Sequence, residues 1–188
     1  MNDMMLHAPT CCVGDDFVIR AYMCGDESLL SESVTISYDH LKQFMPWAKH
    51  TQTIGESQSV IAKAMANYSR TEDFMLGIFS PDETTQWGGT GFHLREGPLE
   101  TRSAEIGLWI RAEFAHQGMG TRVLSAMLNW GFTAWPWERL TWRCDADNIA
   151  SARVAEKCGM QLEGRLRGHR RKEDGSRVDT LCYAALRS

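Results

Sequence analysis

The sequence predicts a mixed α/β fold (α+β), in which one mixed sheet carries helices on its faces. The chain has 188 residues, of which 43% are hydrophobic and 23% are charged, so it suits a single hydrophobic core. Its apolar patterns follow the order strand, helices, three or four strands, helix, strand, helix and a final hairpin. A run of strands followed by a β–α–β segment predicts a mixed sheet rather than a purely parallel one.

Local patterns predict each element. Strands are expected where apolar residues alternate or form a short run, and helices where they recur every three to four residues. The predicted strands cover 17–22, 73–80, 87–94, 103–111, 139–146, 160–171 and 177–187. The predicted helices cover 25–34, 37–45, 56–69, 121–135 and 148–159.

Capping residues mark several helix ends. Asp26 is the expected N-cap of the first helix, and either Ser37 or Asp39 that of the second. Asn148 is the expected N-cap of the last helix, because its side chain can accept from a free N–H group of the first turn. Gly159 is the expected stop of that helix, because glycine adopts the left-handed conformation at no steric cost.

Composition and charge argue against several classes of protein. The net charge of −4 and the pI near 5.9 do not suggest a nucleic-acid partner. No apolar stretch is long enough to span a bilayer and no secretory signal is recognisable, so we expect no membrane partner and a cytoplasmic location. The six cysteines lack metal-site spacing, so we expect reduced thiols and no metal. We expect one domain over 1–188, with 1–14 as a flexible segment, acting as a monomer or homodimer.

The stretch FAHQGMGT (114–121) joins an apolar strand to a predicted helix. A glycine-rich turn at a helix start presents N–H groups without intrahelical partners, and the helix dipole adds partial positive charge. Such a turn suits a pyrophosphate, which Gly118 and Gly120 would allow to approach closely. The alternative is an ordinary strand–helix turn, because glycine is common in turns. The stretch lacks the Lys-Ser/Thr of a P-loop and the third glycine of a dinucleotide fingerprint.

Three segments together resemble the GNAT acyltransferases, especially the RimJ/RimL-type branch that acetylates N-terminal amines of ribosomal proteins. They are EIGLWI (105–110), AHQGMGTRVLSAML (115–128) and DADNIASARVAEKCGMQLEGRLR (145–167), and MPW at 45–47 matches an early landmark of that branch. The resemblance covers roughly residues 15–187. The pyrophosphate signature of the family, Arg/Gln-x-x-Gly-x-Gly/Ala, fits in two frames. One frame keeps both glycines and begins at Ala115, and the other begins at Gln117 and ends at Arg122; the spacing to the later strand favours the first.

The resemblance implies the GNAT fold, with a central, mixed, mostly antiparallel sheet of six to seven strands, helices on both faces, and a splay between strands four and five. It also implies acetyl transfer from acetyl-CoA, as co-substrate, to a primary amine by direct attack in a ternary complex. The residues expected to bind acetyl-CoA are Leu108, Trp109, Ile110, His116, Gln117, Gly118, Met119, Gly120, Thr121 and Asn148.

Two residues occupy the family's catalytic positions. Glu105 is the expected general base, acting through a water, and its alternative role is a strand-end ion pair. Ser151 is the expected general acid for the departing CoA thiolate, and its alternative role is helix capping. Tyr183 is a weaker proton-donor candidate, since a tyrosine on such a strand is more often part of the core.

The acceptor is expected to be the N-terminal α-amine of a protein or peptide. Such an amine titrates near pH ~8, against ~10.4 for lysine, so it needs less help to become neutral. The alternatives are a small-molecule acceptor, such as a polyamine, an aminoglycoside or an aminoacyl-nucleotide, and a CoA-binding regulatory module without turnover. Trp47 and Trp87 are candidates for lining an acceptor pocket. The basic cluster is expected to be a charged hairpin face rather than a nucleic-acid patch, and it could hold the 3′-phosphate of CoA; it consists of Arg165, Arg167, Arg170, Arg171 and Lys172.

Overall fold

One sheet of eight strands runs through the computed structural model, which describes residues 8–14, 16–172 and 174–187. The strand order is β1-β2-β3-β4-β5-β6-β8-β7, and of the described strands only β5 and β6 are parallel neighbours. The strands are β1 (Cys11–Val13), β2 (Val18–Ala21), β3 (Phe74–Phe79), β4 (Gln86–His93), β5 (Ser103–Ile110), β6 (Arg139–Asp145), β7 (Gln161–Arg171) and β8 (Arg177–Leu186). The mixed, mostly antiparallel sheet that was predicted is therefore confirmed.

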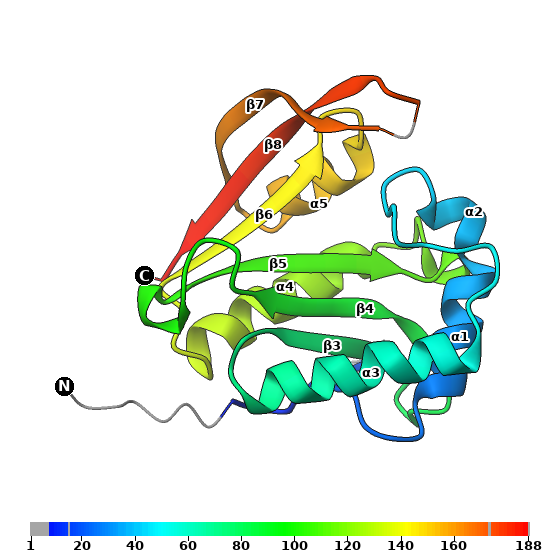
Figure 1. Cartoon of the computed structure of the whole chain (residues 1–188). Coiled ribbons are helices and arrows are strands. Elements are labelled where there is room, and N and C mark those ends of the chain that lie inside the picture. The colour runs from blue at the N-terminus through cyan, green and yellow to red at the C-terminus, as the bar shows by residue number, and fades with distance from the viewer. Residues whose placement is uncertain (1–7, 15, 173, 188) are drawn as a thin grey trace.

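Helices cover both faces of this sheet. The α-helices are α1 (Glu27–Ile36), α2 (Tyr38–Leu41), α3 (Ile54–Ser69), α4 (Met119–Thr133) and α5 (Ile149–Lys157), and short 3₁₀ turns lie at Leu99–Thr101 and Ala112–Phe114. Figure 1 shows α3 in front of the sheet and α4 behind it. No helix of the described residues is both long and apolar enough to cross a membrane.

Two differences from the sequence prediction concern the N-terminal segment and the second helix. The sheet has eight strands rather than six to seven, because Cys11–Val13 pairs with β2 inside the N-terminal segment that we expected to be flexible. Residues 1–7 of that segment lie outside the described part of the chain. The second helix ends at Leu41 rather than at 45, and turns precede Pro46, whose ring disfavours helical geometry in the residue before it.

Two hydrophobic clusters flank the sheet. The larger cluster packs α4 and α5 against it and contains a group of aromatic rings whose centroids lie 4.8–6.1 Å apart: Phe74, Phe92, Trp130, Trp135 and Trp137. The smaller cluster lies under α1 and α3 and includes Tyr22, Leu30, Val34, Ile61 and Phe79. Aromatic burial of this kind makes a large contribution to the stability of the core. Trp130 and Trp135 are both buried in this core.

The sheet divides where β5 and β6 separate. They pair only through Ser103–Glu105 and Arg139–Thr141, after which β5 continues beside β4 and β6 beside β8. Figure 1 shows the two strands diverging from their common start. These are the fourth and fifth strands of the sequence prediction, so the predicted splay is present. It leaves β1–β5 on one side and the three strands β6, β8 and β7 on the other.

Candidate active site

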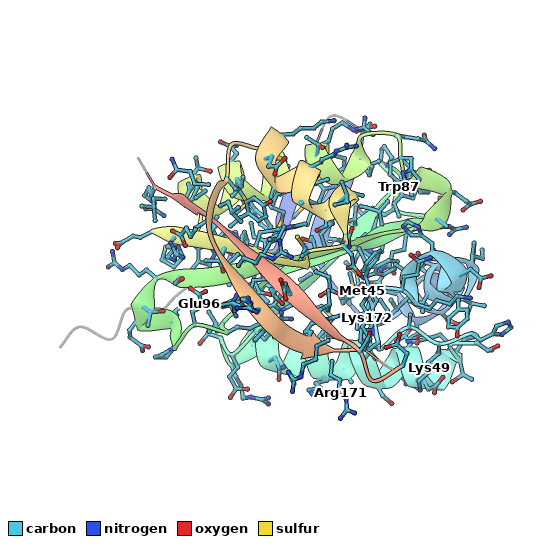
Figure 2. The ribbon with its side chains drawn as sticks, turned by 90° about the horizontal axis from the view of Figure 1, so that it is seen from above. Met45, Lys49, Trp87, Glu96, Arg171 and Lys172 are labelled. Carbon is cyan, nitrogen blue, oxygen red and sulfur yellow. The ribbon has the colours of Figure 1, made fainter. Side chains whose placement is uncertain are left out.

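A cavity of about 700 Å³ opens where β5 and β6 diverge. Its lining comes from Tyr22 after β2, from α1, α3 and the segment between α2 and α3, from strands β3 to β6, from the start of α5 and from the β7–β8 hairpin. Figure 1 shows the segment after α2 beneath the far end of the hairpin. In Figure 2, Met45 and Lys49 of that segment lie in the same region as Arg171 and Lys172 of the hairpin. The cavity therefore lies between the two parts of the sheet.

Glycines on β4 and β5 leave room on one face of the cavity. A Cβ atom at Gly89 would lie 2.3 Å from Nε1 of Trp109. A Cβ atom at Gly107 would lie 2.8 Å from Nε2 of His93. Neither distance is possible for real atoms in contact, so the indole and the imidazole occupy the space that larger residues would fill.

Glu105 is the last residue of β5 that pairs with β6, and it is 4% exposed. Its Oε1 accepts a hydrogen bond from Arg95. Its Oε2 lies 3.6 Å from Nε of Arg143 and has no hydrogen-bond partner among the described residues. Arg143 in turn donates to Glu96, labelled in Figure 2, over 2.8 Å. The ion pair considered as an alternative is present, and one buried oxygen of the same carboxylate still has an unused capacity to accept.

Ser151 lies in the first turn of α5, where two hydrogen bonds fix it. Its N–H donates to Oδ1 of Asn148 over 3.1 Å, which confirms Asn148 as the N-cap. Its Oγ accepts from Nε1 of Trp142 over 3.1 Å. A hydroxyl that accepts from an indole keeps its own proton available for donation. Cys144 also lines the cavity, and burial raises the pKa of its thiol.

The turn before α4 carries a run of free N–H groups. Gly118, at φ +77°, is the N-cap, and the helix begins at Met119, two residues earlier than predicted. His116 is also left-handed, at φ +61°. Within the described residues, the N–H groups of 116–121 donate to no protein acceptor. Free donors at a helix N-terminus, preceded by left-handed residues, form a site suited to an anion.

This turn adjoins the divergent part of the sheet. A Cβ atom at Gly120 would lie 3.4 Å from Cγ2 of Val154 on α5 and 3.9 Å from Cδ2 of Leu108 on β5. The thiol of Cys158 donates to the carbonyl oxygen of Thr121 over 3.4 Å. The first turn of α4 is therefore packed against the same strand and helix that line the cavity.

The structure brings together part of the predicted site. The predicted residues that line the cavity are Glu105, Leu108, Trp109, Asn148 and Ser151. Ile110 and residues 116–121 lie outside that lining, along β5 and at the start of α4. Gln117 turns its side chain back on its own loop, where Nε2 donates to the carbonyl oxygen of Glu113 over 2.7 Å.

The remaining aromatic candidates separate into two groups. Trp47 lines the cavity and forms an edge-to-face pair with Trp109 at 5.8 Å. Trp87 does not line the cavity, and its ring packs against that of Phe114 with 4.5 Å between the ring centroids. Tyr183 lies outside the lining as well, and its hydroxyl lies 3.1 Å from Oε1 of Glu156. Burial raises the pKa of the Tyr183 hydroxyl to about 12.

Sequence reasoning missed a histidine that lies opposite Glu105 in the cavity. His93 lines it, and its Nδ1 lies 2.8 Å from Oδ1 of Asp73. His93 is the direct cross-strand partner of Glu105. A histidine at the end of a glycine-rich strand is visible in the sequence, but the register that sets it opposite Glu105 is not. Arg95 and Arg143 were missed for the same reason.

The charged lining is not acidic overall. It contains the basic residues Lys49, Arg95, Arg143 and Arg170 and the acidic residues Glu56, Glu105 and Asp145. Each of these carboxylates has a basic partner. Lys49 pairs with Glu56 and lowers its pKa to about 2. Arg170 lies 2.7 Å from Asp145, whose pKa is nevertheless raised because it is buried.

Comparison with known proteins gives a consistent family. A family model described as an acetyltransferase (GNAT) domain matches residues 20–161. An uncharacterized N-acetyltransferase of Bacillus subtilis (strain 168), YoaA, is 30% identical over 139 residues, which cover 74% of this chain and 77% of the relative. The ribosomal-protein-serine acetyltransferase of Escherichia coli (strain K12) is 28% identical over 127 residues, covering 68% and 69%.

A solved structure supports the fold. RimL, a ribosomal L7/L12 α-N-protein acetyltransferase in complex with coenzyme A, superposes with a TM-score of 0.83 at 23% identity. The match covers 93% of this chain and 96% of that one. In that complex, coenzyme A is joined by a disulfide to one of the enzyme's cysteines.

Proposed function

The chain belongs to the GNAT acetyltransferase family and is an acetyltransferase, and from this premise we propose that it acetylates the N-terminal α-amine of a protein or peptide. The acetyl group would come from acetyl-CoA by direct attack in a ternary complex. The observation that supports this best is that a buried carboxylate, Glu105, and a hydroxyl, Ser151, line one cavity at the splay of β5 and β6.

We assign the binding of acetyl-CoA to the turn before α4 and to the open edge of β5. The free N–H groups of 116–121 suit the pyrophosphate. Backbone groups of 108–110, which β6 does not pair, suit the amides of the pantetheine arm. That RimL was solved with coenzyme A bound supports the choice of co-substrate. Since Gly118 caps the helix and Gln117 is turned away, the signature frame that begins at Ala115 fits better.

The proposed chemistry uses two proton transfers at the cavity. Glu105, through a water on its unpartnered Oε2, accepts the proton that the nitrogen loses as the new amide forms. Ser151 donates a proton to the departing sulfur, and Asn148 holds its backbone in the first turn of α5. An N–H group of 108–110 would stabilise the negative charge that develops on the thioester oxygen.

The lining supports an α-amine acceptor over a polyamine. A polyamine carries several positive charges and would need an excess of free carboxylates. Here the carboxylates are outnumbered by basic residues, and Glu56, Glu105 and Asp145 are already paired. An α-amine presents a single positive charge, which it loses near pH ~8. The similarity to a ribosomal-protein-serine acetyltransferase points the same way.

An aminoacyl-nucleotide acceptor is the second candidate. Trp47 is 46% exposed, lines the cavity and pairs with Trp109, so it offers an aromatic surface on which a nucleobase can stack. This candidate requires the same donor site and the same proton transfers.

An acceptor screen that follows release of the CoA thiol tests the proposal. Unblocked peptides should be acetylated, whereas the same peptides with a blocked N-terminus, polyamines and aminoglycosides should not. Glu105→Gln and Ser151→Ala should each lower kcat by at least about tenfold, because general acid–base catalysis typically contributes more than that. Glu96→Gln is the matched control, since it alters the same ion-pair network at Arg143 outside the cavity and should retain activity.

Three results would count against it. Turnover with an aminoacyl-nucleotide and not with peptides would select the second candidate. Tight binding of acetyl-CoA without CoA release from any amine would indicate a regulatory module. Full activity of both Glu105→Gln and Ser151→Ala would remove the proposed catalytic roles.

A further inference from the structure

His93 and Asp73 form a hydrogen-bonded pair beside Glu105. Nδ1 of His93 lies 2.8 Å from Oδ1 of Asp73, which precedes β3. A carboxylate can only accept in this bond, so the imidazole donates from Nδ1, and in its neutral form Nε2 carries the free lone pair. No hydrogen bond occupies Nε2 among the described residues. The side chain of His93 is 16% exposed, so the imidazole is largely buried but remains in contact with solvent.

The position of Nε2 is set by the glycines of β4 and β5. A Cβ atom would lie 2.8 Å from Nε2 at Gly107 and 3.2 Å from it at Gly91. The ring therefore lies over the β5 backbone between Glu105 and Trp109. These residues of β5 overlap the start of the edge, 108–110, that we assign to the pantetheine arm. On that assignment, Nε2 of His93 lies over the β5 residue that directly precedes the pantetheine-binding edge.

We propose that His93, oriented by Asp73, is a second catalytic base, which takes the first proton from the acceptor ammonium before Glu105 acts. This inference rests on the proposed function and deepens it. In the step, one N–H bond of the ammonium breaks, its electron pair stays on the nitrogen, and the proton forms a bond to Nε2. The resulting imidazolium faces the carboxylate of Asp73 and later releases its proton to solvent.

Two bases account for the two protons that the nitrogen must lose. The arriving ammonium loses one proton before it can attack, and the attacking amine loses another as the amide forms. The second proton, taken by Glu105, then replaces through solvent the one that Ser151 gives to the sulfur, and the first leaves the enzyme from His93. Glu105 alone would have to take both, although one of its oxygens is bound by Arg95.

Among the described residues, the other charged side chains that line the cavity are already paired. Arg95 is bound to Glu105 beside it, and Arg143 of β6 is bound to Glu96. Across the cavity the pairs are Lys49 with Glu56 and Arg170 with Asp145. His169 of β7 lies within hydrogen-bonding distance, 3.0 Å, of Oγ1 of Thr180. Replacement of the His93 side chain should therefore leave these pairs intact.

The test compares pH profiles of kcat/KM for an N-terminal peptide. His93→Gln should lower kcat/KM by about 100-fold at pH 6.5, the low end of the usual contribution of a general base. The loss should shrink towards wild-type rates above pH 9, where the α-amine has already lost its proton. Asp73→Asn should lower kcat/KM with the same dependence on pH, but by a smaller factor. His169→Gln is the matched control, because it removes the other cavity histidine and should retain the wild-type profile.

A merely structural role for His93 predicts a different result. A loss of equal size at every pH, or one that follows a lower unfolding midpoint, would overturn the proposal, as would an unchanged profile. If the wild-type protein acetylates peptides while His93→Gln keeps its profile, only this inference fails. If the wild-type protein acetylates no peptide amine, the proposed function itself fails.

Discussion

Gly118 holds a left-handed conformation at the start of α4, at φ +77°. Gly159 holds the same conformation, at φ +76°, after α5, and a Cβ atom would meet nothing within 4 Å at either position. Alanine at each position should therefore lower the free energy of unfolding by a similar amount, about 1–2 kcal/mol, from backbone strain alone. Only Gly118→Ala should also weaken acetyl-CoA binding, by about tenfold, because strain there misdirects the N–H groups of 116–121.

Calorimetric titration with acetyl-CoA, alongside thermal unfolding, measures both effects. Equal affinities of Gly118→Ala and Gly159→Ala for acetyl-CoA would show that the turn does not hold the pyrophosphate. An affinity loss in Gly118→Ala beyond that of Gly159→Ala, at matched stability, supports the assignment.

Some residues of the site could be predicted from the sequence because their signals are local. Asn148 and Ser151 lie three residues apart at a helix start, and the hydrogen bond between them follows from that spacing. The His93–Glu105 juxtaposition could not be predicted in this way. It depends on the β4–β5 register, and a shift of one residue would place the two side chains on opposite faces.

Helix α4 shows how tertiary packing overrides helix propensity. Gly131 lies in its interior, where a Cβ atom would be 2.7 Å from Cδ1 of Leu140 and 3.1 Å from Cε1 of Phe92. Gly131→Ala should lower the free energy of unfolding by about 1–3 kcal/mol from overpacking. Gly55→Ala is the contrasting change, since nothing lies within 4 Å of its Cβ position in α3. It should raise that free energy by up to about 1 kcal/mol.

Denaturant unfolding of both variants measures the contrast. If Gly131→Ala proved as stabilising as Gly55→Ala, the close approach of α4 to β6 would not be rigid.

The existence of α4 was predicted correctly from its apolar periodicity, but its first two residues were missed because the turn contains Gly118 and Gly120. Periodicity reports which face is buried and does not report where a glycine-rich helix start begins.

At the scale of the whole molecule, the ligand site depends on both parts of the sheet. Glu105 belongs to the part that contains β1–β5, while Ser151 follows β6 in the other part. Acetyl-CoA should bind the folded chain and not the unfolded one. At 100 times its Kd it should therefore raise the free energy of unfolding by about 2.7 kcal/mol.

Thermal unfolding at increasing acetyl-CoA concentration tests this linkage. Glu105→Gln should keep the stabilisation by acetyl-CoA, because it alters the chemistry rather than the binding. An unfolding midpoint that does not change with acetyl-CoA concentration would contradict the proposed donor site.

The overall fold could be predicted because the order of apolar patterns limits the topology. The lining of the cavity could not, since it joins segments from Tyr22 to Thr180 that meet only after folding.

The short pairing of β5 with β6 has a consequence for how the protein behaves among other proteins. Beyond Glu105 and Thr141, β5 and β6 each have one side without a neighbouring strand among the described residues. Unpaired strand edges on an outer surface recruit strands from other chains and promote aggregation. Here the two edges face each other across an internal cleft. The fold thus keeps the backbone hydrogen-bonding groups of a sheet edge ready for a slender ligand while withholding them from intermolecular β-pairing.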